Sequence, residues 1–62
     1  MQMYDQLPED PAILLSFINT LLRDTYASLD ELCRSLAVDR QEITDRLSAI
    51  EYEYDEELNR FV

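Results

Sequence analysis

A chain of 62 residues forms at most one small domain, because at this size only about 60% of the unfolded surface becomes buried, which leaves no spare core for an elaborate active site. Hydrophobic residues make up 47% of the sequence and charged residues 31%, a balance typical of a folded globular chain rather than a disordered one. Fourteen acidic residues against five basic ones give a net charge of −9, which repels phosphate and attracts basic surfaces, so nucleic acid is an unfavourable partner.

Side chains suited to catalysis or metal binding are scarce. The sequence contains no histidine and no lysine, so the usual general bases are missing, and its single cysteine, Cys33, lies on an apolar stripe without an evident partner. We therefore expect no enzymatic activity, no cofactor and no small-molecule substrate. The acids of residues 51–57 could gather a hard cation such as calcium, but the glycine and the ligand periodicity of an EF-hand loop are missing, so a solvated acidic hairpin is favoured over a metal site.

The sequence predicts a soluble cytoplasmic protein. The N-terminus MQMYDQLPEDP carries acids and lacks the basic start of a secretion signal, and the longest apolar run, AILL, is far shorter than the roughly 20 residues of a membrane span. A lone cysteine cannot form an internal disulfide, which fits a reducing compartment. We expect the chain to be unprocessed and to have no contact with a membrane.

Residues 1–9 are predicted to be irregular, and a first helix is predicted over residues 10–25. Asp10 can cap this helix, and Pro11 suits its first turn because the missing N–H would have had no partner there. Its apolar residues recur at helical period and form a broad stripe that should be the central core element. The stripe consists of Ile13, Leu14, Phe17, Ile18, Leu21 and Leu22.

Two shorter helices are predicted over residues 28–37 and 39–50. Each begins with a capping box, in which a serine or aspartate and a glutamate three residues later satisfy backbone donors at the helix start. The two boxes are Ser28 with Glu31 and Asp39 with Glu42. The connection is so short that the helices must cross. Their inner stripes are Leu29, Leu32, Cys33 and Leu36, then Ile43, Leu47 and Ile50.

The tail EYEYDEELNRFV, residues 51–62, changes from a helical to an alternating period. Tyr52 and Tyr54 alternate with acids, as in a half-buried strand. The turn DEELN ends in Asn59, which tolerates the left-handed conformation, so residues 60–62 can pair back as a second strand. Three helices and a terminal hairpin predict a single domain over residues 1–62, mainly α with a C-terminal β-hairpin, with a helix-turn-helix core and a winged-helix-like architecture.

The apolar spacing of residues 28–50 resembles the helix-turn-helix of bacterial DNA-binding proteins, with Ala37 where many members have glycine. In such a motif the outer face of the third helix would enter the major groove. The residues on that face are Arg40, Gln41, Thr44, Asp45 and Ser48. The charges of this helix cancel, however, and residues 51–62 carry five acids and one arginine, a local charge of −4 where a wing would meet phosphate. The pattern therefore predicts the fold and disfavours DNA binding.

Aromatic side chains of the hairpin could instead anchor a protein partner, since such residues carry much of the energy at interfaces. We expect two of Tyr52, Tyr54 and Phe61 to close the small core, because a hairpin needs an apolar face against the helices. The candidate partner surface combines the third helix with the hairpin. It consists of Arg40, Gln41, Thr44, Asp45, Tyr52, Tyr54 and Arg60.

Three blocks of the sequence, LPEDPAILLSFINTLLRD, SLDELC and YEYDEELNRF, resemble a family of short bacterial proteins known only as domain of unknown function 4250. The resemblance covers residues 7–62. It implies a small stand-alone bacterial protein and brings no catalytic residue, cofactor or partner. Glu51 departs from the family pattern, which leads us to expect glycine before YEYD at the corner between helix and strand.

Two functional hypotheses follow from the sequence. The first is a non-enzymatic acidic module that binds another protein, or a second copy of itself, through the hairpin and the outer face of the third helix. The alternative is a helix-turn-helix transcription regulator that binds DNA in spite of its charge, as a dimer or beside a basic partner. Mimicry of DNA by the acidic surface is a third idea, which depends on charge alone.

Overall fold

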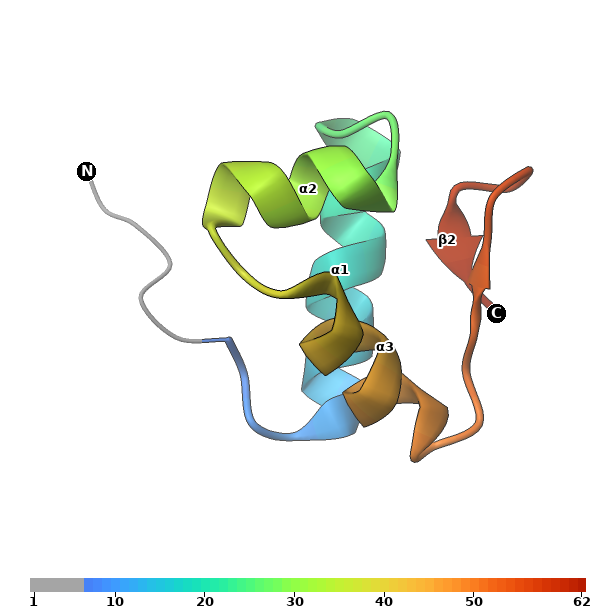
Figure 1. The fold of residues 1–62 in the computed structure, drawn as a ribbon. Coiled ribbons are helices and arrows are strands. Elements are labelled where there is room, and N and C mark those ends of the chain that lie inside the picture. Colours follow the sequence, from blue (N-terminus) through green and yellow to red (C-terminus); the bar gives the residue numbers. More distant parts are fainter. Residues whose placement is uncertain (1–6) are drawn as a thin grey trace.

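The computed structural model describes residues 7–62, in which three helices are followed by a two-stranded hairpin (Figure 1). The helices are α1 Pro11–Asp24, α2 Leu29–Leu36 and α3 Arg40–Ser48, and the strands are β1 Tyr54–Asp55 and β2 Arg60–Phe61. The predicted class, mainly α with a C-terminal β-hairpin, is thus confirmed. Of the nine residues expected to be irregular, the first six lie outside the described residues, and the other three belong to no helix or strand.

Each helix begins directly after the capping residue that the sequence indicated, whose side-chain oxygen accepts a hydrogen bond from a backbone amide of the first turn. The pairs are Asp10 Oδ1 with Ala12 N (2.8 Å), Ser28 Oγ with Glu31 N (3.1 Å) and Asp39 Oδ1 with Gln41 N (2.9 Å). The glutamates of the capping boxes behave differently from the prediction. Glu31 accepts from the amide of Ala27 at 3.4 Å, and the carboxylate of Glu42 lies 3.8 Å from the guanidinium of Arg46, so the second box is not formed.

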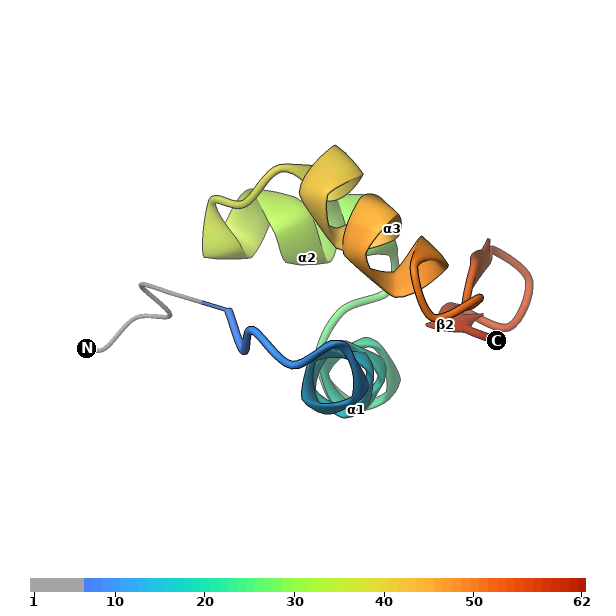
Figure 2. The ribbon, with the colours of Figure 1, turned by 90° about the horizontal axis from the view of Figure 1, so that it is seen from below.

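The core lies between α1 and the pair α2 and α3, with the hairpin beside it (Figure 2). It consists of Leu14, Ile18, Leu22, Leu29, Leu32, Cys33, Ile43, Leu47 and Phe61. Most of the predicted stripes therefore face inward. Ile13 was wrongly included, since its side chain is 58% exposed. Successive helical residues are about 100° apart, so a stripe two residues wide extends beyond the contact with α2 and α3 and leaves Ile13 on the flank.

The chain has no glycine, and among residues 7–62 a positive φ is adopted by Ala37 (59°), Glu51 (69°) and Asn59 (55°). Ala37 is the C-cap of α2, and Glu51 closes the turn that follows α3 with the same pattern of hydrogen bonds. The amide of the turn residue and the next amide donate to carbonyls three and five residues before them, an arrangement that usually has glycine at the left-handed position. Many helix-turn-helix proteins have glycine at the position of Ala37, and the family resemblance leads us to expect glycine at the position of Glu51. The backbone therefore keeps the expected left-handed turns, at Asn59 as well, although the side chains of Ala37 and Glu51 oppose them.

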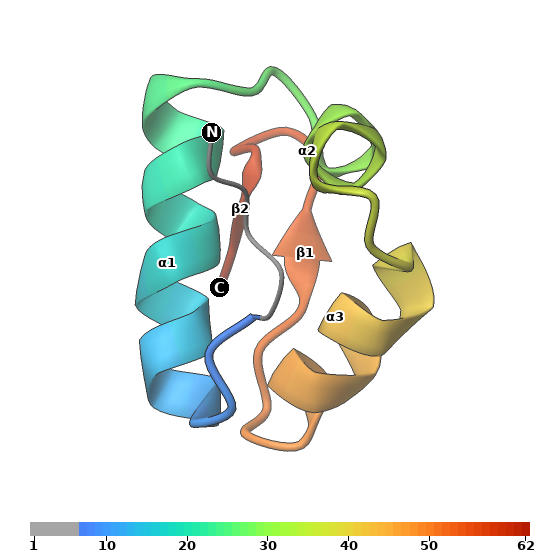
Figure 3. The ribbon, with the colours of Figure 1, turned by 90° about the vertical axis from the view of Figure 1, so that its left-hand side faces the viewer.

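The hairpin strands pair antiparallel, with Tyr54 opposite Phe61 and Asp55 opposite Arg60. Because Glu53 and Val62 exchange two backbone hydrogen bonds (3.0 and 2.9 Å), the N–H and C=O of Phe61 point away from β1 toward α1. Figure 3 shows β2 between α1 and β1. The Asn19 side chain of α1 accepts from Phe61 N at 2.8 Å and donates to Phe61 O at 3.1 Å, so this amide takes the place of a third strand at the edge of β2.

Candidate functional site

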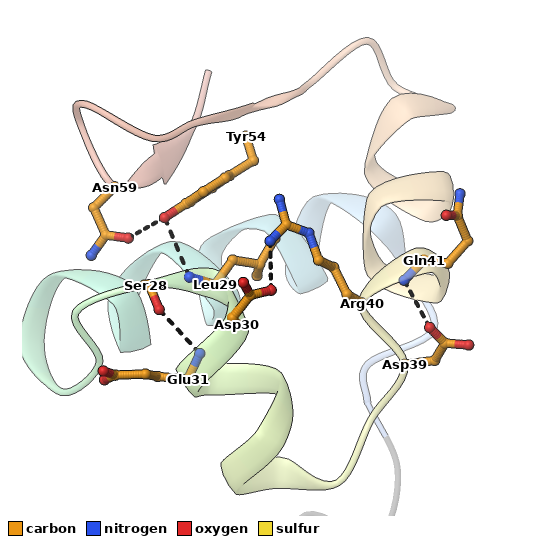
Figure 4. Close-up of polar contacts among 9 residues, drawn as sticks. All are labelled: Ser28, Leu29, Asp30, Glu31, Asp39, Arg40, Gln41, Tyr54 and Asn59. Atoms are coloured by element: carbon orange, nitrogen blue, oxygen red, sulfur yellow. Dashed lines mark hydrogen bonds and ion pairs between the residues drawn. The ribbon is translucent and has the colours of Figure 1, made fainter.

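Arg40, the first residue of α3, connects three elements (Figure 4). Its Nη1 lies 2.6 Å from Asp30 Oδ1 at the start of α2, and its Cζ lies 5.6 Å from the centre of the Tyr54 ring. The hydrogen bond to Asp30 raises the pKa of the Arg40 guanidinium further above its ordinary range. The charge of Arg40 is therefore already shared between a carboxylate and an aromatic face of its own chain.

Tyr54 is half-buried and directs its hydroxyl toward the start of α2 (Figure 4). The hydroxyl accepts a hydrogen bond from Leu29 N at 3.3 Å and donates to Asn59 Oδ1 at 2.5 Å. The Leu29 amide is one of the donors that the first turn of a helix leaves without an intrahelical partner, so Tyr54 helps to cap α2. Its ring also packs at 53° on the Phe61 ring, with 5.6 Å between the ring centres. Tyr54 and Phe61 thus close the core, as expected for two of the three aromatics.

Asn59 connects the hairpin turn to the end of α1. Its Nδ2 donates to Leu22 O at 3.1 Å and to Tyr26 O at 3.0 Å, while its Oδ1 accepts from the Tyr54 hydroxyl. The carbonyls in the last turn of a helix need partners of this kind. One asparagine side chain therefore satisfies a carbonyl in the last turn of α1 and one in the loop that follows it, and it also fixes the hydroxyl that caps the next helix.

Three of the other polar side chains predicted to read DNA, those of Gln41, Thr44 and Asp45, bond within α3. Gln41 Nε2 donates to Asp45 Oδ1 at 2.8 Å, and Thr44 Oγ1 donates to the carbonyl of Gln41 at 3.1 Å. Arg46 donates to the carbonyl of Pro8 and forms the ion pair with Glu42. Both arginines of α3 are thus engaged by their own chain, which leaves no unpaired cation on this helix.

The end of α3 and the segment that leads into the hairpin carry exposed carboxylates and an exposed aromatic residue. Tyr52 is 37% exposed, and Glu51 and Glu53 on either side of it are exposed. Asp45, in the last two turns of α3, is also exposed. We call these four residues the acidic face. None of its carboxylates forms an ion pair with the described residues.

Arg60 is not part of this surface. It lies on β2 and lines a separate groove of about 780 Å³ between α1 and the hairpin turn, together with Arg23. The structure therefore divides the predicted partner surface into three parts. Arg40 and Tyr54 belong to the scaffold, the exposed residues of α3 and Tyr52 face solvent, and Arg60 belongs to the groove.

The sequence does not predict the side-chain contacts of two asparagines that connect distant segments. Asn19 lies within the apolar stretch SFINTLL, where a lone amide signals a buried hydrogen bond, but its partner is 42 residues away. The sequence predicts the left-handed turn at Asn59 but not the hydrogen bonds of its side chain. The ion pair of Asp30 with Arg40 bridges the two helices of the helix-turn-helix pattern and has no local sequence signal.

Cys33 is 6% exposed, and burial raises the pKa of its thiol. A thiol in such an apolar site stays protonated and is a poor nucleophile. Among residues 7–62, no three histidine, cysteine, aspartate or glutamate side chains gather in a way that could hold a metal ion.

A family model described as a domain of unknown function (DUF4250) matches residues 8–61, which confirms the resemblance noted in the sequence. No curated protein and no solved structure matches the chain. Within the part of the chain that the structure describes, no helix has the length and apolar character needed to cross a bilayer.

Proposed function

The chain belongs to the DUF4250 family, which carries no assigned activity, and from its surface we propose that it is a non-enzymatic module that binds a basic protein partner. The binding surface is the acidic face. Its partner presents arginine or lysine side chains to Asp45, Glu51 and Glu53, together with an apolar or planar group that packs on the Tyr52 ring. Aromatic side chains are enriched at protein interfaces, where a polar rim surrounds the buried centre of the contact.

This proposal is supported by a difference in ion pairing between the arginines of α3 and the carboxylates of the acidic face. The arginines of α3 are engaged by Asp30, Glu42 and a backbone carbonyl, whereas the three carboxylates of the acidic face form no ion pair within residues 7–62. Uncompensated carboxylates around Tyr52 attract a basic surface, and this attraction speeds association and selects the partner more than it adds affinity. The interaction should therefore weaken as salt increases.

Affinity purification from a lysate of the source organism tests the proposal. The double variant Glu51→Lys with Glu53→Lys reverses the charge beside Tyr52, and because both side chains are exposed the fold should be retained, as circular dichroism would verify. Glu9→Lys is the matched control, since Glu9 is also exposed but precedes α1. We expect a basic protein that the wild type and the control retain and the double variant loses.

The captured protein should then bind the purified chain saturably, and the amide signals of Tyr52 and its neighbours should shift in an NMR titration. Binding that is equal for the wild type and the double variant would contradict the acidic face as the site. Failure to find any saturable protein partner would contradict the proposed function itself.

DNA binding is the second candidate, and the connection between α2 and α3 favours it. Leu32, Cys33, Ile43 and Leu47 are buried and Ala37 is left-handed, which is compatible with a helix-turn-helix in a winged-helix-like domain. A gel shift with random duplex DNA at low salt, where electrostatic binding is strongest, tests it, and absence of a shift there would eliminate it. Arg40 is unsuitable for mutation because it supports the fold, so Gln41→Glu is the informative variant.

A further inference from the structure

The groove between α1 and the hairpin turn is lined by positive charge, whereas the molecule as a whole is negatively charged. Among the residues that the structure describes, its lining includes Arg23 and Arg60 and no carboxylate, although acidic residues outnumber basic ones by fourteen to five in the chain. Arg23 also pairs with Asp24 at 2.8 Å, whereas Arg60 forms no ion pair with the described residues. Arg60 is thus the groove's available positive charge.

The polar groups in the floor of the groove are already satisfied. Asn19 is bonded to the backbone of Phe61, and Asn59 is bonded to the end of α1 and to Tyr54. Apart from the hydroxyl groups of Ser16 and Thr20, the hydrogen-bond donors that remain available there belong to the arginines. What the groove offers is apolar surface from Leu15 and Leu58 beside the arginines. An apolar group accompanied by carboxylates is the complementary ligand.

The hairpin turn next to the groove carries that combination of side chains. Leu58 is 55% exposed, and the two residues before it, Glu56 and Glu57, are exposed carboxylates. We call Glu56, Glu57 and Leu58 the acidic tip. Because Leu58 also lines the groove, the tip and the groove are neighbours on one surface. A two-fold axis through this surface places each tip over the groove of the other copy, since a two-fold interface joins the same patch on both subunits.

We propose that the occupant of the groove is the acidic tip of a second copy of this chain, so that the protein forms a two-fold homodimer through α1 and the hairpin turn. Leu58 of each copy packs beside Leu15 of the other, and Glu56 and Glu57 approach Arg60. The inference rests on the proposed protein-binding role and gives it a second surface, which shares no residue with the acidic face.

Sedimentation equilibrium or light scattering at increasing concentration tests the dimer directly. The measurement belongs near 0.15 M salt, where a screening length of about 8 Å suppresses the repulsion between two copies of charge −9 without removing short-range contacts. Leu58→Asp should weaken the dimer at least about 20-fold, because two apolar contacts are lost in each dimer. Arg34→Glu, an exposed arginine on α2 outside the groove, is the matched control and should leave the dimer unchanged.

A pair of charge-reversal variants gives a sharper test. Arg60→Glu places a glutamate opposite the partner's acidic tip, and Glu56→Arg with Glu57→Arg places arginines opposite Arg60, so each variant alone should be monomeric. When the two variants are mixed, both tip-to-groove contacts become opposite in sign. We therefore expect a heterodimer about as stable as the wild-type homodimer. A structural defect in either variant would not be repaired in this way.

A wild-type chain that stays monomeric up to millimolar concentration would overturn the proposal, as would a dimer that Leu58→Asp and Arg60→Glu leave intact. Monomeric variants that fail to associate when mixed would equally place the contact elsewhere. The outcome is independent of the acidic face, because Glu51→Lys with Glu53→Lys should lose the basic partner and keep the dimer. The variants of the tip and the groove should keep the basic partner.

Discussion

Replacement of Asn59 tests whether its side chain holds the hairpin turn against the helices. The residue does two separable things: its backbone takes a positive φ of 55°, and its side chain makes three hydrogen bonds that join the hairpin turn, α1 and Tyr54. Asn59→Gly keeps the backbone freedom and removes the side-chain bonds. Asn59→Ala removes both, and Asn59→Asp keeps the shape and the acceptor but turns the donor that faces two carbonyls into a negative charge.

The expected losses follow from these contacts. Each net hydrogen bond contributes about 0.5–1.5 kcal/mol, so Asn59→Gly should lower the free energy of unfolding by about 2–3 kcal/mol. Asn59→Ala should cost about 1 kcal/mol more, the penalty of a left-handed residue that carries a Cβ. Asn59→Asp should cost at least as much as the alanine, because its carboxylate faces the carbonyls of Leu22 and Tyr26. A chain of this length has a total stability of about 3–9 kcal/mol, so these are large fractions.

Urea denaturation followed by far-UV circular dichroism measures these differences, with Glu53→Gln as the control at an exposed position of the same hairpin. The melting temperature of the Asn59→Gly variant should be roughly 10–20 °C below that of the wild type, because each kcal/mol of lost stability lowers Tm by about 4–8 °C in a domain of this size. An Asn59→Asp variant within about 0.5 kcal/mol of the wild type would refute the reasoning, since that is the range of ordinary surface substitutions.

Three further predictions concern the core and the turns. Leu32→Asp should abolish the helical circular dichroism signal, because a carboxylate at this fully buried position has no partner, and a near-normal melt would contradict the core assignment. Glu51→Gly should raise the free energy of unfolding by about 1 kcal/mol, as measured by urea denaturation, because glycine adopts a φ of 69° without the steric cost of a Cβ. The control variant Glu53→Gly should lower the free energy of unfolding. Burial raises the pKa of the Cys33 thiol in the folded state, which means that folding favours the protonated thiol. The contribution of Cys33 to the free energy of unfolding is therefore complete below the pKa of the thiol in the unfolded chain, and it is lost as the pH rises through the pKa of the thiol in the folded chain. Cys33→Ala should flatten that alkaline loss, and an unchanged pH profile would assign it to other groups.

Two residues of the predicted partner surface make contacts within their own chain. Arg40 and Tyr54 looked like partner-binding residues because one is charged and the other aromatic. In the fold they contact each other, with 5.6 Å between the guanidinium and the ring centre, and they support α2 through Asp30 and Leu29. A residue type indicates what a side chain can bind, whereas only the fold shows whether its own chain already occupies it.

The sequence by itself determined the elements and their turns. Caps at Asp10, Ser28 and Asp39, apolar residues at helical spacing, and the left-handed Asn59 are properties of a few consecutive residues, so local rules describe them well. They also gave most of the core, because a helix face follows from its period.

Only the tertiary structure decided how the elements are joined and which surfaces remain open. Asn19 bonds to Phe61 across 42 residues and Asn59 bonds to Leu22 across 37, and no periodicity within a helix or hairpin encodes such pairs. The same packing separates Arg60 from Arg40 and places it in the groove beside Arg23. Contacts between segments depend on how three short helices and a hairpin bury their apolar faces together, so they exist only after the whole chain has folded.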